Sequence, residues 1–436
     1  MANSNSPKVR SFQRVLFVAG ITATSLFSLP GCSSGPSTAP RATTTSKFSF
    51  WPLAPDEPRI QFLGAFNSSE DVAPTQSTGL EKIVFGAEAV RPAFVNKPYG
   101  VAIRDGKIYV CDIRAKALVV MDLAKKQTRL VGVTGTTRLE RPVAVAIADD
   151  GMIFVADGIH GAILVFDRNE RFVRSISIPK LKPASLAMSG DRLYVADMGR
   201  QQILIVDSKS GQQIGEIGSV GDEPGQFRLP IGVSTDKAGN VYVADMMRCN
   251  VQKFSASGSF VSTVGVQGDH AGGFARPKHL ALDSDGIMYV VDSSFQNVQM
   301  FDGEFNLLMH FGAAGDFPGA MNLPVGIAVT DTGIEFFKDR LHPGFAAKRL
   351  IVVANQFGDS KISIYAMGER KSNYALSDLS AAAADVQSGV GTPSAEALKF
   401  QNIGGVEPGP DGTVPDSPQE PAADPLPPTV PQPPKK

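Results

Sequence analysis

The 436-residue sequence has few residues of the kinds that build metal centres or disulfide scaffolds, with five histidines and three cysteines. The histidines show no H-x-H or H-x₃-H spacing, so no zinc signature is present and we expect no metal, no cofactor and no identifiable catalytic residue. The formal net charge is −1, which gives no overall field to attract nucleic acid. Helical periodicity is also scarce. These absences argue against a nucleic-acid partner, a zinc enzyme and an all-α fold.

What the sequence has instead is a pair of strand patterns that occurs six times. The first strands of the pairs read KIYVCD (107–112), MIFVAD (152–157), RLYVAD (192–197), NVYVAD (240–245), IMYVVD (287–292) and LIVVAN (350–355). A proline-led strand precedes each pair, and the copies recur every 40 to 63 residues, a period typical of four-stranded propeller blades. One blade cannot bury both faces of its sheet. The sequence therefore predicts an all-β, six-bladed β-propeller.

The sixth copy lacks an outer strand after its pair, whereas the other five have one. A candidate lies far upstream, because RIQFLGA (59–65) matches LLMHFGA (307–313) of the fifth copy in its apolar positions and its final Gly-Ala. We expect residues 59–65 to complete the sixth blade, which leaves no open sheet edge. The alternative is an unrelated tether strand.

The sequence around the repeats differs in composition. Residues 33–50 are rich in Ser, Thr and Pro, and eleven prolines lie between Pro408 and Pro434, so both regions are expected to be disordered. The predicted organisation is a signal peptide at 1–31, a flexible tether at 32–54, the propeller at 55–369 with repeats from about residue 90, and a disordered Pro-rich tail at 370–436.

The N-terminus has the pattern of a secretory signal. Three basic residues within positions 8–14 precede an apolar run from Val15 to Leu29, which is shorter than the ~20 residues of a membrane-spanning helix. The following Pro30-Gly31-Cys32 resembles a bacterial lipobox, whose Cys becomes the diacylated first residue of a lipoprotein. By this resemblance Cys32 is lipidated and Ser33 favours the outer membrane, with the propeller facing the periplasm. The alternative is secretion without a lipid.

The aspartates that end the first strands recur in five of the six copies. Residues that repeat so often are typical of structure, and we expect each carboxylate to accept backbone N–H bonds from the following turn.

The repeat unit resembles the NHL repeat. The pattern P-x-G-V/I-A, then G-x-I/V-Y-V-A-D, then N-V-Q-x-F, with connectors such as GSVGDEPGQF (218–227), extends over roughly 280 residues. WPLAPDEPRIQFLG (51–64) is also similar to the opening of bacterial envelope NHL lipoproteins without a settled function. The resemblance implies a non-catalytic interaction platform. Related six-bladed rings include lactonases and a lyase, so the alternative is a metal-dependent hydrolase or lyase with its site in the central channel.

Basic residues take a position where the NHL family commonly places Asn. Arg114, His160, Arg200 and Arg248 lie in or beside this loop slot of the first four repeats, and Lys278 and His279 follow a repeat proline near the axis. The loop is expected on the same face as the connector before each proline. These residues predict a basic funnel for a protein or an anionic polymer, on a monomeric ring held to a membrane through Cys32. The alternative is solvated charge.

The sixth repeat carries an insertion, around residues 333–349. It exposes Phe336, Phe337 and Phe345 unless these fold back, so it is either a functional loop or a plug of the channel.

Overall fold

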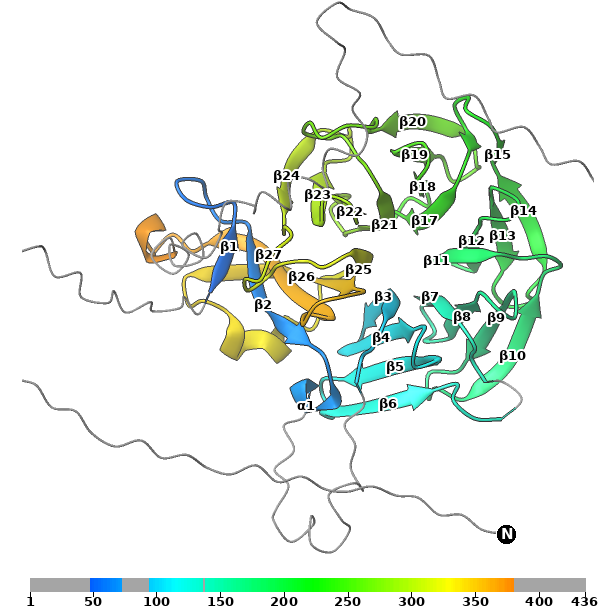
Figure 1. Ribbon diagram of the computed structural model, residues 1–436, viewed down its shortest axis with the longest axis horizontal. Coiled ribbons are helices and arrows are strands. Elements are labelled where there is room, and N and C mark those ends of the chain that lie inside the picture. The colour runs from blue at the N-terminus through cyan, green and yellow to red at the C-terminus, as the bar shows by residue number, and fades with distance from the viewer. Residues whose placement is uncertain (1–47, 73–93, 136–137, 380–436) are drawn as a thin grey trace, which may run out of the picture. The chain divides into compact units, whose positions relative to one another are not determined.

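A computed structural model describes residues 48–72, 94–135 and 138–379 of the chain. Five four-stranded sheets and one five-stranded sheet stand around a common centre (Figure 1), which confirms the six-bladed, all-β propeller. No helix in this part of the chain is both long enough and apolar enough to cross a membrane. The predicted signal peptide, the lipidation residue Cys32 and the tail from residue 380 lie outside the described residues.

The first three blades each follow the chain from the innermost strand to the outermost. They consist of β3 (Pro98–Arg104), β4 (Lys107–Asp112), β5 (Ala117–Asp122) and β6 (Gln127–Val131); β7 (Pro142–Ile147), β8 (Ile153–Asp157), β9 (Ala162–Phe166) and β10 (Phe172–Ser177); and β11 (Pro183–Ser189), β12 (Arg192–Asp197), β13 (Gln202–Asp207) and β14 (Gln213–Ile217).

The other three blades complete the ring. Blades four and five consist of β17 (Pro230–Thr235), β18 (Val241–Asp245), β19 (Asn250–Phe254) and β20 (Phe260–Val264), and of β21 (Pro277–Leu282), β22 (Met288–Asp292), β23 (Asn297–Phe301) and β24 (Leu307–Phe311). Blade six consists of β25 (Pro324–Thr330), β26 (Phe345–Asn355), β27 (Ile362–Arg370), β2 (Ile60–Phe66) and β1 (Ser49–Trp51). The short elements α1 (Ser69–Val72), β15 (Ser219–Val220), β16 (Gln226–Phe227) and η1 (Ile334–Arg340) lie between strands.

How deeply a strand is buried accounts for the pattern of apolar and polar residues along it. The second strand of blade two, β8, is buried along its whole length, so it reads as the continuous apolar run IFVAD. The outer strand β20 alternates between half-buried and exposed residues and reads FVSTV. Asp105 and Gly106, between β3 and β4, have φ of 50° and 70°, as a tight type I′ hairpin turn requires.

The core lies between neighbouring blades. One cluster joins Phe154 of blade two to Leu193 of blade three, and another joins Tyr242 of blade four to Val290 of blade five. Since each sheet buries its faces against the next sheet, the six blades depend on one another.

The closing strand is confirmed. Strand β2 pairs antiparallel with β27 over Ile60–Phe66, with Ile60 opposite Met367 and Phe66 opposite Ile362. Strand β1 then pairs with β2 from the outside. Residues 49–51 are therefore part of the sheet, although the sequence assigned them to a flexible tether ending at residue 54. The difference arises because the apolar Phe50 is buried against Phe345.

The insertion in blade six folds over the closing strand. Phe337 and Phe345 are buried, and Phe336 remains partly exposed. The buried amide of Gln61 in β2 donates to the carbonyl of Arg340 (2.9 Å) and accepts from the backbone N–H of His342 (3.1 Å). Among the described residues, none from 334 to 349 lines the central channel. The insertion holds the ring closed.

The predicted tail begins later than residue 370. Strand β27 includes Arg370, whose guanidinium pairs with Glu57, and Leu379 is buried in the same cluster as Phe50. Tyr374 packs edge-on against His342. Residues 371–379 therefore belong to the folded unit, because their apolar side chains cover the outer part of blade six.

Candidate functional site

The connectors before the first strands and the loops between the second and third strands form one face of the ring, called here the rim face. Backbone hydrogen bonds join the two sets in each blade, for example from Gly158 N–H to Arg141 O (2.8 Å) and from Met198 N–H to Lys182 O (3.0 Å). The predicted placement of these loops on one face is what the structure shows.

The repeat aspartates hold the rim together. Asp157 is fully buried, and its carboxylate accepts the backbone N–H groups of Glu140 (2.7 Å), Arg141 (3.0 Å), Ile159 (2.9 Å) and His160 (3.0 Å). Burial raises the pKa of Asp157, but these N–H donors outweigh it and the pKa lies below its usual value. The predicted structural role of the repeat aspartates is confirmed.

Equivalent carboxylates occur in the other blades. Asp112, Asp197, Asp245 and Asp292 are buried and accept from connector and loop N–H groups. In blade six Asn355 replaces the Asp; its amide donates to Ser360 O and to Ser363 Oγ.

Two of the predicted rim cations are bound by the ring itself. Arg200 pairs with Asp197 (2.5 Å) and donates to Pro179 O (2.6 Å). Arg248 donates to the carbonyls of Glu223 (3.0 Å) and Gln226 (2.5 Å) in the connector. These guanidiniums brace connectors, which leaves them less available to a partner.

The other predicted rim residues differ in exposure. Arg114 and His160 are exposed, and His160 Nδ1 lies 3.4 Å from Asp157 Oδ1. Lys278 is half-buried; burial, and then the charge of Arg276, lower its pKa. Among the described residues no side-chain hydrogen bond or ion pair holds Arg114 or Lys278.

His279 lies in the central channel and not on the rim face. Its Nε2 is 2.9 Å from Ser185 Oγ of blade three, and burial lowers its pKa to about 4. The imidazole of His279 is therefore neutral at pH 7, and it adds no charge to the predicted basic funnel.

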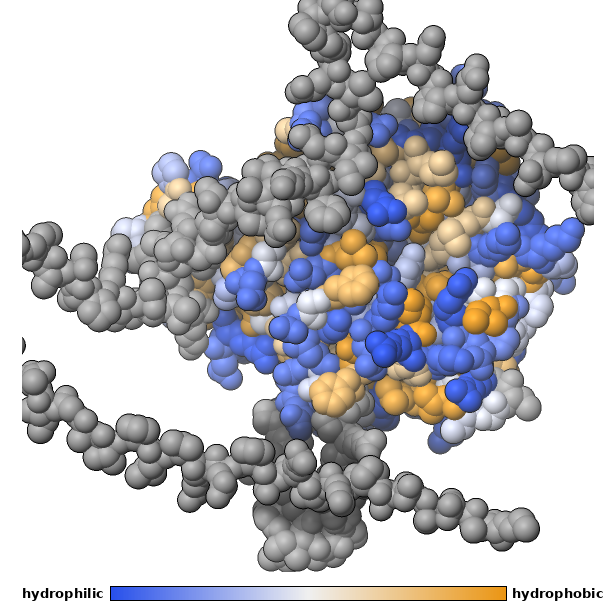
Figure 2. Space-filling view, viewed as in Figure 1, coloured by the Kyte–Doolittle hydropathy of each residue, from blue (hydrophilic) through white to orange (hydrophobic). Residues whose placement is uncertain are grey.

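Exposed apolar side chains on the rim face were missed by the sequence analysis. Ile159, Met247 and Phe357 are 62%, 64% and 55% exposed. All three stand two positions after the residue that ends the second strand, in blades two, four and six. An apolar residue at this position in every second blade is the signal in the sequence that marks these side chains. Figure 2 shows single hydrophobic side chains lying among hydrophilic ones on the face of the ring that it displays.

A groove of about 450 Å³ lies beside one of these residues. It is lined by Ile159 and His160 of the loop and by the connector 178–181, which includes Lys180. Lys180 and the adjacent Lys182 are exposed, and within the described residues neither ammonium group is in an ion pair. The groove thus combines an apolar side chain with cations.

The acidic groups of the rim face are paired or lie elsewhere. Glu140, in the connector between blades one and two, is paired with Lys116 (2.6 Å). Asp269, Asp316 and Asp359 are exposed residues in the connectors and loop of blades four to six. Asp222 is paired with Arg228. Arg114, Lys180 and Lys182 lie on the half of the rim made by blades one to three, called here the cationic arc. Arg276 and Lys278 of blade five also have no ion pair among the described residues, and they lie outside this arc.

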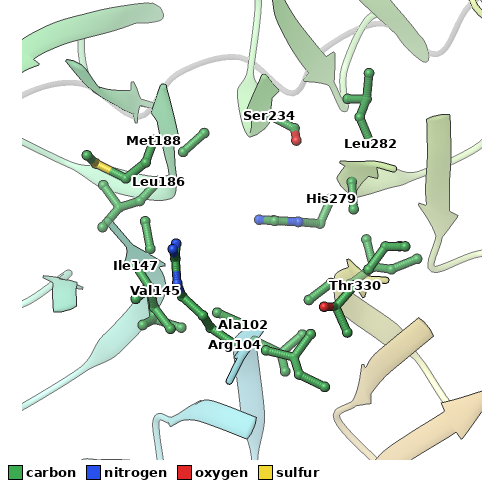
Figure 3. A pocket seen from close by; sticks show the side chains of 18 of the residues that line it. Ala102, Arg104, Val145, Ile147, Leu186, Met188, Ser234, His279, Leu282 and Thr330 are labelled. Carbon is green, nitrogen blue, oxygen red and sulfur yellow. The ribbon is translucent and has the colours of Figure 1, made fainter. Parts of the chain in front are cut away.

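The central channel holds a cavity of about 480 Å³ lined by the first strands of all six blades. Its lining includes Arg104, Asp105, Thr330 and Thr332, so it reaches the ends of the first strands, the side called here the hairpin face. Figure 3 shows His279 and Arg104 directed toward its open centre. Within the described residues, no group of three or more His, Cys, Asp and Glu side chains is arranged to hold a metal ion.

No protein-family model matches the chain. Solved structures similar to it include virginiamycin B lyase from Staphylococcus aureus, with 11% identity, 62% of this chain and 95% of that chain covered, and a TM-score of 0.44. A protein of unknown function from Bacteroides thetaiotaomicron has 15% identity, with 63% of this chain and 70% of that chain covered and a TM-score of 0.47. The calcium-binding protein regucalcin from Agrobacterium tumefaciens has 11% identity, with 63% of this chain and 91% of that chain covered and a TM-score of 0.42. The six blades are consistent with the NHL resemblance, and similarity at this level assigns no activity.

Proposed function

We propose that the propeller is a non-catalytic binding platform whose cationic arc takes an acidic protein partner. The observation that carries this is the groove lined by both the exposed Ile159 and Lys180, on a rim face that also presents the unpaired Lys182 and Arg114. Exposed apolar groups bordered by charge are typical of protein-interaction sites.

The apolar residues favour a protein over an anionic polymer. A polymer of repeating negative charge would use Arg114, Lys180 and Lys182, but it would gain little from Ile159, which is 62% exposed. A protein segment with acidic and apolar side chains uses both. The cations then speed the encounter and the buried apolar contact slows dissociation.

We further infer that the platform is attached to a membrane through Cys32. The support is the lipobox-like Leu29-Pro30-Gly31-Cys32 after a basic and apolar leader. The proposal includes an outer-membrane position facing the periplasm, with the ring acting as a monomer.

The alternative function is a metal-dependent hydrolase or lyase in the channel. Its support is the ring architecture alone, because among the described residues no cluster of metal-ligating side chains lines the channel. The exposed groove therefore gives the platform the stronger support.

The test is photo-crosslinking from position 159 combined with charge reversal. With p-benzoylphenylalanine in place of Ile159, the full-length chain in cells should give a defined crosslinked protein, whose identity follows from mass spectrometry. The partner's affinity should fall at least about tenfold in the R114E/K182E variant and should decrease with salt.

The matched control is K126E/K237E, which makes the same charge change with two exposed lysines on the hairpin face. It should bind the partner like the wild type. If both double variants lose affinity equally, or neither does, or no protein crosslinks at position 159, the cationic arc is not the binding site.

A further inference from the structure

The central channel has the dimensions of a small-ligand site. Its cavity of about 480 Å³ lies within the range of ~300–1,000 Å³ usual for such pockets. It is lined by the first strands of all six blades, so the packing of the blades against one another fixes its wall. It is separate from the groove on the rim face, which is lined by blade two and the connector after it.

Six equivalent positions of the first strands lie around the end of the channel that is nearer the rim face. Five hold small residues, which are Gly100, Ala144, Ser185, Gly232 and Gly326, and the sixth holds His279. The strands crowd at this level: a Cβ on Gly326 would lie 2.2 Å from Tyr99 O, and one on Gly232 would lie 2.7 Å from Lys278 O. His279 is therefore the single large side chain of this set, and it projects into the cavity that widens beyond it.

Two hydroxyl groups face the open space of the cavity (Figure 3): those of Ser234 and Thr330. Among the described residues no side-chain hydrogen bond holds the hydroxyl of Ser234, which leaves it free to bond to a ligand. His279 Nε2 is engaged with Ser185 Oγ, and His279 Nδ1 is covered by the protein.

The single cation at the cavity lies beside two carboxylates. Arg104, at its mouth, lies 3.2 Å from Asp149 Oδ1 and 3.7 Å from Asp105 Oδ2. His279 is neutral at pH 7, since burial lowers its pKa to about 4. A charged ligand would give up its hydration without meeting a free charge of opposite sign, so the cavity disfavours ions of either sign.

The walls differ in polarity. Figure 3 shows Val145, Ile147, Leu186 and Met188 on one side of the cavity; on the opposite side Ser234, His279 and Thr330 lie together with Leu282. A ligand that matches both walls has an apolar face and an edge of hydroxyl groups, which are the properties of a pyranose ring.

We propose that the channel is a binding site for a small uncharged polyhydroxylated molecule of monosaccharide size, which enters from the hairpin face. Its hydroxyl groups hydrogen-bond to Ser234 Oγ and Thr330 Oγ1 beside the His279 imidazole, and its C–H face packs on Leu186 and Met188.

The test is calorimetric titration of the full-length chain with two neutral sugars, methyl β-glucopyranoside and N-acetylglucosamine. A detergent without a sugar headgroup is used. We expect saturable binding of at least one of them with Kd below about 10 mM, and binding of glucuronate and glucosamine at least about tenfold weaker. The imidazole nitrogen resonances of His279 should shift on saturation with the neutral sugar.

The variants locate the site. Ser234→Leu fills the cavity and should abolish binding, whereas Ser234→Ala removes only the hydroxyl and should weaken it by about twofold to tenfold. Ser294→Leu, the same change at an exposed loop on the rim face, is the control and should leave Kd unchanged. Failure of both neutral sugars to bind, equal binding of the charged sugars, or binding that is unaffected in both Ser234 variants would each overturn the proposal.

Discussion

Replacing Asp157 by Asn should loosen the loop that carries the proposed groove. In the wild type, one carboxylate oxygen accepts from Glu140 and Arg141, and the other accepts from Ile159 and His160. Asparagine keeps one acceptor oxygen and places an NH₂ group against the other two N–H donors. Two hydrogen bonds to a charged group are lost, at about 1.5–3 kcal/mol each, and water at the exposed loop restores part of this.

We therefore expect Asp157→Asn to lower the free energy of unfolding by about 2–4 kcal/mol at pH 7. Asp359→Asn is the control, because Asp359 is exposed and no hydrogen bond holds it among the described residues; its effect should stay within about 0.5 kcal/mol. Urea unfolding should be followed by circular dichroism, which reports all blades, and by fluorescence of Trp51, the sole tryptophan, which lies in blade six. Coincident transitions would show that damage in blade two is felt across the ring.

The lowered pKa of Asp157 fixes the direction in which its contribution to stability changes with pH. The folded-state pKa of Asp157 is lowered, so its contribution is fully present above the unfolded value of about 3.9 and is lost as pH falls through the lower folded value. The difference between wild type and Asp157→Asn should therefore shrink below pH ~4. A difference under about 0.5 kcal/mol at pH 7, or one that grows on acidification, would refute the account of the buried carboxylate.

Two other changes test closure and anchoring. Gln61→Leu leaves Arg340 O and His342 N–H without partners and should lower the free energy of unfolding in urea by about 2–4 kcal/mol. The control is Gln213→Leu, at an exposed strand position, which should lower it by less than about 0.5 kcal/mol. Equal losses would show that the insertion does not hold β2. Cys32→Ser should release the chain from membranes and abolish labelling with palmitate, and unchanged partitioning with an unlabelled wild type would contradict lipidation.

The ring and its closure were predictable because they rest on repetition. A pattern that occurs six times fixes the blade, and the Gly-Ala ending of RIQFLGA identified β2 by its likeness to an outer strand. Strand β1 was missed because three residues, SFW, carry no repeat pattern; its place depends on Phe50 meeting Phe345.

The site was predicted only in part. Loop positions in the repeat placed Arg114 and His160 on the rim face, but they do not show which cations the ring binds itself. Arg248 is held by carbonyls of its connector, and the repeat pattern does not predict the backbone conformation that brings these carbonyls to it. His279 was expected on the rim because it follows a repeat proline closely; in the structure it projects into the channel, where the other five blades leave space.

The bonds that close the ring and the groups that we propose bind a partner lie in different blades, and this separation has a physical reason. At the junction of blades five and six, the buried Arg349 lies 3.3 Å from Asp283 and 2.9 Å from Asp331, and Gln61 fixes the insertion on β2. A ring is most easily opened where its two chain ends meet, so extra bonds there protect the whole fold. The loops of blades one to three are held by buried aspartates and need no such reinforcement. Their side chains are free to vary, which is why a binding surface is to be sought there and not beside the closure.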